Sequence, residues 1–104
     1  MSEPRLAVGR GVIEEMVRLA AFEVPGVARV GRGGPRWRSW RRPRPVEVDV
    51  QDGKVRVRVS IVARPGQPLE PLAAEVRSAV AAAVERLLGM ELAEVSVLVD
   101  GVGA

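Results

Sequence analysis

The chain contains no histidine, cysteine, tyrosine, threonine or asparagine among its 104 residues. Without cysteine it has no disulfide framework and no thiolate ligand for a metal ion. A zinc site would need carboxylate ligands alone, which is unusual. Most nucleophiles and general bases of enzymes belong to the missing residue types. We therefore expect a protein that is not an enzyme and has no catalytic residue, metal ion, cofactor or small-molecule substrate. A glycosidase-like carboxylate pair is compatible with the composition, but polar and aromatic residues for such a site are few.

Aromatic residues and long apolar runs are also scarce. Phe22, Trp37 and Trp40 are the only aromatic residues, so a core must consist mainly of Val, Leu, Ile and Ala. No apolar run reaches the roughly 20 residues of a membrane-spanning helix, and the first residues do not have the pattern of a secretory signal. The length suits a single domain over residues 1–104. The expected location is the cytoplasm.

The positive charge is concentrated in one segment. The chain has 16 basic and 13 acidic residues, and seven arginines but no acid lie between Arg29 and Pro45. The rest of the chain keeps nine basic and 13 acidic residues, a net charge of −4. The sequence therefore describes an acidic domain that carries one strongly basic segment.

Two segments have the apolar periodicity of amphipathic helices. The first, residues 11–24, is ended by Pro25-Gly26, and its apolar stripe consists of Ile13, Met16, Val17, Ala20 and Val24. Three further apolar residues, Val12, Leu19 and Phe22, widen this stripe. We interpret the widened stripe as facing the core, with contact to a partner as the alternative. The second helix is predicted over residues 69–88, with Gly89 as the residue that ends it.

The clearest strand signal is a hairpin over residues 46–51 and 54–63. Valines alternate with polar residues in both segments, and Asp52-Gly53 between them is typical of a two-residue turn. This turn fixes the register, in which the facing pairs are Val50 with Val55, Asp49 with Arg56, Val48 with Val57, and Glu47 with Arg58. The two pairs of opposite charge, each worth about 0.2–1 kcal/mol, occupy the outer face, and the valines form the inner one.

A short strand at residues 27–31 and a last strand at 92–99 complete the pattern, and residues 101–104 are expected to be loose. The fold class is α+β with the order α-β-β-β-α-β. We predict a small mixed sheet of three to four strands with both helices packed on one face. The segment 54–63, the second helix and the last strand form a β-α-β unit, whose crossover is expected to be right-handed.

The order of these pieces resembles the alkaline shock protein family of bacterial envelope-stress proteins. The resemblance rests on Val24-Pro25-Gly26-Val27, on the hairpin, on Leu88-Gly89-Met90 after the Ala/Val-rich helix, and on the closing run from Val95 to Val102. It implies a non-enzymatic cytoplasmic protein, of which some relatives self-associate and are held near the membrane by a separate membrane protein. The family has no catalytic motif to transfer, and the segment at 32–45 departs from it.

We expect a flexible Arg/Trp-rich loop at residues 32–45, because its glycines and prolines interrupt both helix and strand. The candidate residues for binding an anionic partner are Arg36, Trp37, Arg38, Trp40, Arg41, Arg42 and Arg44. Anionic membrane headgroups suit arginine and tryptophan together. Phosphates and unpaired bases of a nucleic acid suit them too, as does an acidic protein. In the alternative without a partner, the arginines pair with the acidic face of the domain and the tryptophans cover its core.

The leading hypothesis is an envelope-stress or scaffold protein that forms homo-oligomers and docks on a membrane-anchored protein or an anionic lipid surface. Its expected place is the cytoplasm, including the inner face of the cell membrane. The second hypothesis is a nucleic-acid-binding protein that acts through the Arg/Trp-rich loop.

Overall fold

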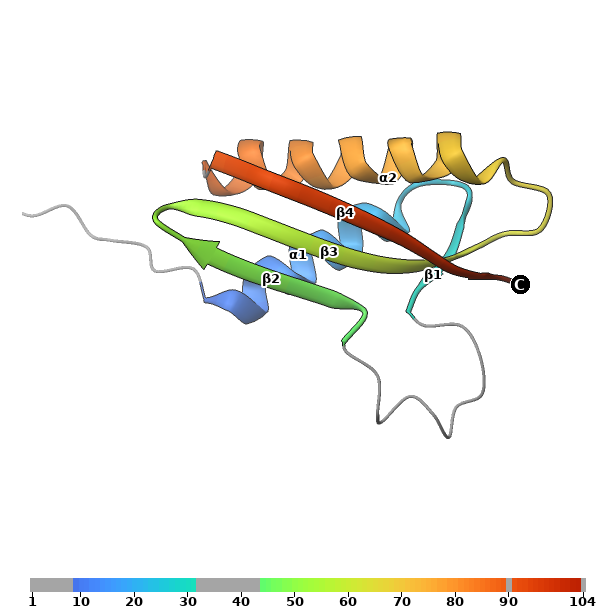
Figure 1. The fold of residues 1–104 in the computed structure, drawn as a ribbon, viewed down its shortest axis with the longest axis horizontal. Helices are drawn as coiled ribbons and strands as arrows, with labels where there is room; N and C mark the ends of the chain where they lie inside the picture. The colour runs from blue at the N-terminus through green and yellow to red at the C-terminus, as the bar shows by residue number, and fades with distance from the viewer. Residues whose placement is uncertain (1–8, 32–43, 90, 104) are drawn as a thin grey trace, which may run out of the picture.

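The computed structural model describes residues 9–31, 44–89 and 91–103. Its elements are α1 (Arg10–Phe22), β1 (Val27–Val30), β2 (Val46–Gln51), β3 (Lys54–Ala63), α2 (Leu69–Ala83) and β4 (Glu91–Val102), as Figure 1 shows. A π-helical turn, Val84–Leu88, continues α2. The helix then ends at Gly89, whose φ of 62° is the left-handed conformation expected at this position. The observed order α-β-β-β-α-β confirms the predicted fold class.

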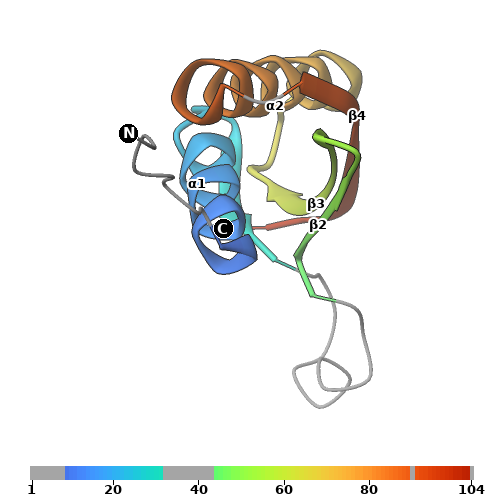
Figure 2. The same ribbon diagram turned by 90° about the vertical axis from the view of Figure 1, so that its left-hand side faces the viewer.

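The sheet is mixed and is built around β3. Both β1 and β2 pair antiparallel with β3, and β4 pairs with it in parallel. Because β1 pairs with the end of β3 and β2 with its beginning, these two strands follow one another along the same edge. The other edge of β3 belongs to β4. Figure 2 shows α1 and α2 on one side of this sheet, as the sequence predicted.

The hairpin has the predicted register throughout. Each of the four expected pairs is observed, and the facing pairs extend to Val46 and Val59. Asp52 and Gly53 have φ values of 52° and 75°, as a turn with two left-handed residues requires. On the outer face Arg58 Nη1 lies 3.7 Å from Glu47 Oε2.

The core consists of aliphatic side chains from one face of the sheet and from both helices. Its buried members include Ile13, Val17 and Ala21 of α1, Val55, Val57, Val59 and Ile61 of β3, and Leu72, Val76 and Val80 of α2. The interpretation of the widened stripe of α1 as core-facing was wrong. Val12, Leu19 and Phe22 are 54%, 48% and 51% exposed, because a straight helix presents only one side to the sheet.

The last strand, β4, extends further toward the C-terminus than predicted. The prediction of a loose tail was wrong for residues 101–103, since β4 extends to Val102 and the N–H of Gly103 donates to the carbonyl oxygen of Ala63 at 2.9 Å. The physical reason is the length of β3, whose last residues still offer backbone partners to β4. The outer limits of α1 differ from the prediction by one or two residues.

The residues on either side of the basic segment are hydrogen-bonded to the same residue of β3, Ser60. The N–H of Gly31 donates to the carbonyl oxygen of Ser60 at 2.9 Å, and the N–H of Ser60 donates to the carbonyl oxygen of Pro45 at 2.7 Å. Both ends of the segment are therefore held at the middle of β3. The predicted flexible loop at 32–45 lies outside the described residues except for Arg44 and Pro45.

Candidate functional site

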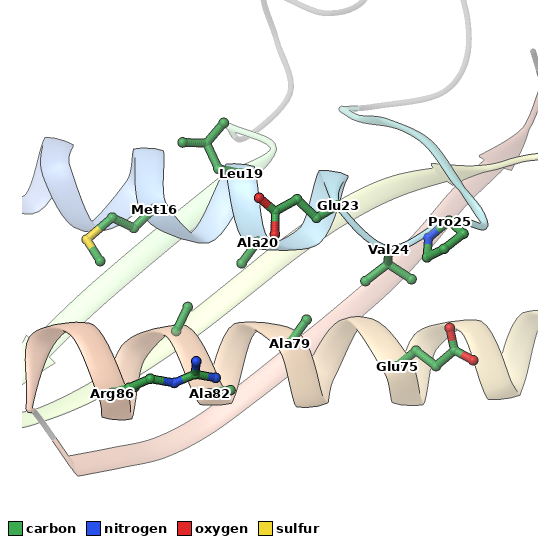
Figure 3. A pocket seen from close by; sticks show the side chains of 11 residues that line it. Met16, Leu19, Ala20, Glu23, Val24, Pro25, Glu75, Ala79, Ala82 and Arg86 are labelled. Carbon is green, nitrogen blue, oxygen red and sulfur yellow. The ribbon is translucent and has the colours of Figure 1, made fainter.

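An apolar groove lies between α1 and α2. It encloses about 560 Å³. Its walls come from the second half of α1 with the residues that follow it, and from one side of α2 (Figure 3). The lining residues are Met16, Leu19, Ala20, Glu23, Val24, Pro25, Glu75, Ala79, Ala82, Ala83 and Arg86.

The groove exists because α2 presents very short side chains to α1. Ala79, Ala82 and Ala83 recur at the i, i+3 and i+4 spacing that places residues on one side of a helix. Longer side chains there would fill the space between the two helices. On the other wall Leu19 keeps 48% of its surface exposed. Leu19 and the alanines therefore form one apolar surface along the groove.

Three charged side chains border this apolar floor. Glu23 comes from the end of α1, and Glu75 and Arg86 come from α2. Within the described residues, no ion pair joins Arg86 to either glutamate. The border therefore carries two carboxylates and one guanidinium, which favours a ligand with an apolar surface and flanking basic groups.

The outer face of the sheet forms a smaller, polar hollow. It is lined mainly by Glu47, Asp49, Arg56, Arg58 and Glu94. Glu47 and Arg58 form an ion pair, whereas Asp49 and Arg56 face each other in the register without one. Acidic and basic side chains alternate across this face, so it does not present a surface of one charge.

An ion pair on α1 changes the pKa of its acidic member, Glu15. Arg18 donates hydrogen bonds to both carboxylate oxygens of Glu15, with Nη2 to Oε1 at 2.5 Å and Nε to Oε2 at 3.2 Å. These hydrogen bonds and the positive charge of Arg18 lower the pKa of Glu15 below its ordinary value. The pair is exposed and lies outside the groove, so it supports the helix locally.

Across residues 9–31, 44–89 and 91–103, no group of three or more acidic residues is placed to hold a metal ion.

Of the seven residues predicted to bind an anionic partner, the structure describes only Arg44. Its side chain is 80% exposed, and its Nη1 lies 3.7 Å from Glu14 Oε2 of α1. The other six, Arg36, Trp37, Arg38, Trp40, Arg41 and Arg42, lie outside the described residues. Arg44 is not part of the wall of the groove. The alanines of α2 are visible in the sequence and predict a close approach to the sheet, whereas Ala79, Ala82 and Ala83 line the groove beside α1.

Comparison with known proteins gives a family and a fold. The family that matches is the ASP23 family, described by a cell envelope-related function, and the match covers residues 2–104. It confirms the resemblance to the alkaline shock proteins. The search of curated proteins gave no match. In the part of the chain that the structure describes, no helix has the length and apolar character to cross a membrane.

Solved structures of MamM CTD have a similar fold. The structure titled MamM-CTD 215-293 is 19% identical with a TM-score of 0.59, and the match covers 89% of this chain and 99% of that one. A copper form is 19% identical with a TM-score of 0.59, covering 89% and 98%. A manganese form is 20% identical with a TM-score of 0.58, covering 89% and 99%. At this level of identity the likeness concerns the fold alone.

Proposed function

The chain belongs to the ASP23 family, and we propose that it is a non-enzymatic interaction domain of the cell envelope that associates with itself and docks on a membrane-linked protein. The observation that carries the docking part is the apolar groove between α1 and α2. Support for a non-catalytic role comes from the chain's own residue types, which leave out histidine and cysteine, and from the envelope-related description of the family.

The occupant that suits the groove is an amphipathic helix of the membrane-linked partner. Full burial of a leucine side chain is worth about 1.5–3 kcal/mol, so a residue as exposed as Leu19 would gain roughly 1 kcal/mol when a partner covers it. The alanines of α2 leave space for apolar side chains of the partner. Basic residues beside those side chains would lie near Glu23 and Glu75. Apolar anchors at helical spacing are the usual way in which a helix binds in such a groove.

The basic segment supplies a second contact in this proposal. Its candidate residues are Arg36, Trp37, Arg38, Trp40, Arg41, Arg42 and Arg44. We propose that they bind the anionic surface of the inner face of the membrane, where each arginine can add about 1 kcal/mol. The exposure of Arg44 and the attachment of both ends of the segment at Ser60 support this placement. Nucleic acid is the alternative ligand.

The test is co-sedimentation of the purified chain with two kinds of vesicle. Inside-out membrane vesicles from the cells that express the chain are used before and after protease treatment, and liposomes of phosphatidylglycerol and phosphatidylethanolamine contain no protein. Binding to untreated vesicles that falls after protease treatment supports a protein partner. Binding to the liposomes that falls with added salt supports the lipid contact.

Two matched variants connect this binding to the groove. Ala82→Glu places a carboxylate on the groove wall, whereas Ala74→Glu places it at an exposed position of α2 outside the groove. We expect loss of protease-sensitive binding for A82E only. Equal binding by both variants would exclude the groove, and no binding to any vesicle would refute the docking part of the proposal. Preferential, salt-sensitive binding of single-stranded oligonucleotides over liposomes would favour the nucleic-acid alternative.

A further inference from the structure

In the part of the chain that the structure describes, the outer edge of β4 is a long strand edge without a neighbouring strand. Within the described residues β4 pairs with β3 and with no other strand. β4 has 12 residues, and its sequence ELAEVSVLVDGV contains no lysine, arginine or proline; its charged residues are Glu91, Glu94 and Asp100. Proteins that keep an edge strand unpaired usually protect it with residues such as lysine and proline or make it short. The edge of β4 is therefore suited to pairing with another strand.

The side chains along β4 are also only partly covered. Leu98 on the outer face is 44% exposed. The valines of the inner face, Val95, Val97 and Val99, are half-buried, although their partners in β3 are fully buried. A strand added at this edge would cover Leu98 on the outer face and the three valines on the inner face. It would also satisfy the outward-facing backbone groups, which is how an extended segment binds a sheet edge.

We propose that the edge of β4 pairs antiparallel with β4 of a second copy, with Leu98 facing Leu98 across a two-fold axis. Two identical strands that meet in this way form an isologous contact, which closes at a dimer. The two sheets then become one continuous sheet. This inference rests on the proposed self-association and names the surface that carries it.

Among the registers centred on Ser96, Val97 or Leu98 in the middle of β4, the side chains favour one. In an antiparallel pair, facing residues lie on the same side of the sheet. A register centred on Val97 would place Glu94 opposite Asp100, and like charges directly opposite are unfavourable. A register centred on Ser96 would place Leu98 opposite Glu94. The register centred on Leu98 avoids both contacts, since it places leucine on leucine and Ser96 opposite Asp100.

The test uses the absence of cysteine in the chain. Residues that face each other in an antiparallel pair have Cα atoms about 4.5–5.5 Å apart, within the roughly 4.4–6.8 Å that a disulfide spans. Leu98→Cys should therefore form a disulfide-linked dimer on mild oxidation of the dilute full chain. Leu69→Cys is the matched control, because Leu69 is 43% exposed but lies on α2. It should remain a monomer on a non-reducing gel.

Analytical sedimentation of the unmodified chain, which has no cysteine, shows whether the chain self-associates at all. Together with the crosslinking result, it distinguishes a wrong interface from the absence of self-association. A concentration-dependent dimer that is weakened roughly tenfold or more by Leu98→Lys, equivalent to about 1.4 kcal/mol, but not by Leu69→Lys, supports the proposal. If the chain dimerises while L98C crosslinks no faster than L69C and L98K has no effect, the β4 edge is the wrong surface. A chain that stays monomeric at all concentrations refutes self-association itself. Circular dichroism of each variant verifies that it is folded.

Discussion

Two neighbouring positions of α1 give a direct test of which residues hold the domain together and which are available to a partner. Val17 is completely buried, whereas Leu19 is 48% exposed on the wall of the groove. We predict that Val17→Ala destabilises the domain strongly and that Leu19→Ala does so only weakly. Both changes introduce alanine on the same helix, and helix propensity favours both variants, by a few tenths of a kcal/mol more for Val17→Ala because valine is β-branched.

The structure sets the size of each effect. Val17→Ala removes two carbon groups from the core, which costs roughly 1.6 kcal/mol of transfer free energy at about 0.8 kcal/mol per group. The cavity left behind raises the total to about 2–3 kcal/mol. Leu19→Ala removes a side chain that is about half-buried, so the loss should be about 1 kcal/mol or less. At about 4–8 °C per kcal/mol, Val17→Ala should lower Tm by roughly 10–20 °C.

The assay is urea denaturation followed by circular dichroism, with the free energy of unfolding taken from the midpoint and slope. Sedimentation with untreated membrane vesicles is measured on the same samples. We expect Leu19→Ala to remain folded and to bind the vesicles about fivefold more weakly, because covering Leu19 is worth about 1 kcal/mol. A stability loss for Leu19→Ala as large as that for Val17→Ala would refute the reasoning, since Leu19 would then belong to the core.

Three further predictions concern single positions. A Cβ on Gly26 would lie 2.7 Å from Cδ1 of the buried Leu72, so Gly26→Ala should cost about 1–3 kcal/mol through overpacking; an unchanged Tm would contradict this. Gly53 has a φ of 75°, so Gly53→Ala should cost about 1–2 kcal/mol, measured by urea denaturation. The control is Gly103→Ala, where an added Cβ would lie 3.9 Å from Val62. The pKa of Glu15 is lowered by Arg18. The pair therefore stabilises the fold fully above about pH 4.3, the ordinary pKa of glutamate. This contribution disappears as the pH falls through the lowered pKa. NMR titration should show the Glu15 pKa rising in Arg18→Gln, and no rise would exclude that cause.

Local signals in the sequence were sufficient for the elements and for one register. The hairpin was predicted residue by residue, because alternation, the Asp52-Gly53 turn and the charge pairs all depend on neighbours within a few positions. Gly89 and Pro25 likewise marked the ends of helices through backbone conformation alone. The family could be inferred because the order of these local pieces is itself a sequence property.

The surfaces that could bind a partner were decided by the tertiary structure. The stripe of α1 looked continuous in the sequence, and only the position of the sheet and of α2 separates buried Val17 from exposed Leu19. The groove requires α1 beside the alanine wall of α2, two segments far apart in the chain. The outer edge of β4, which has no strand beside it among residues 9–31, 44–89 and 91–103, likewise depends on β1 and β2 sharing the other edge of β3. The periodicity of one segment is enough to determine its own helix or strand conformation. The exposure of its side chains depends on which other segments cover them, and this is determined only when the whole chain packs.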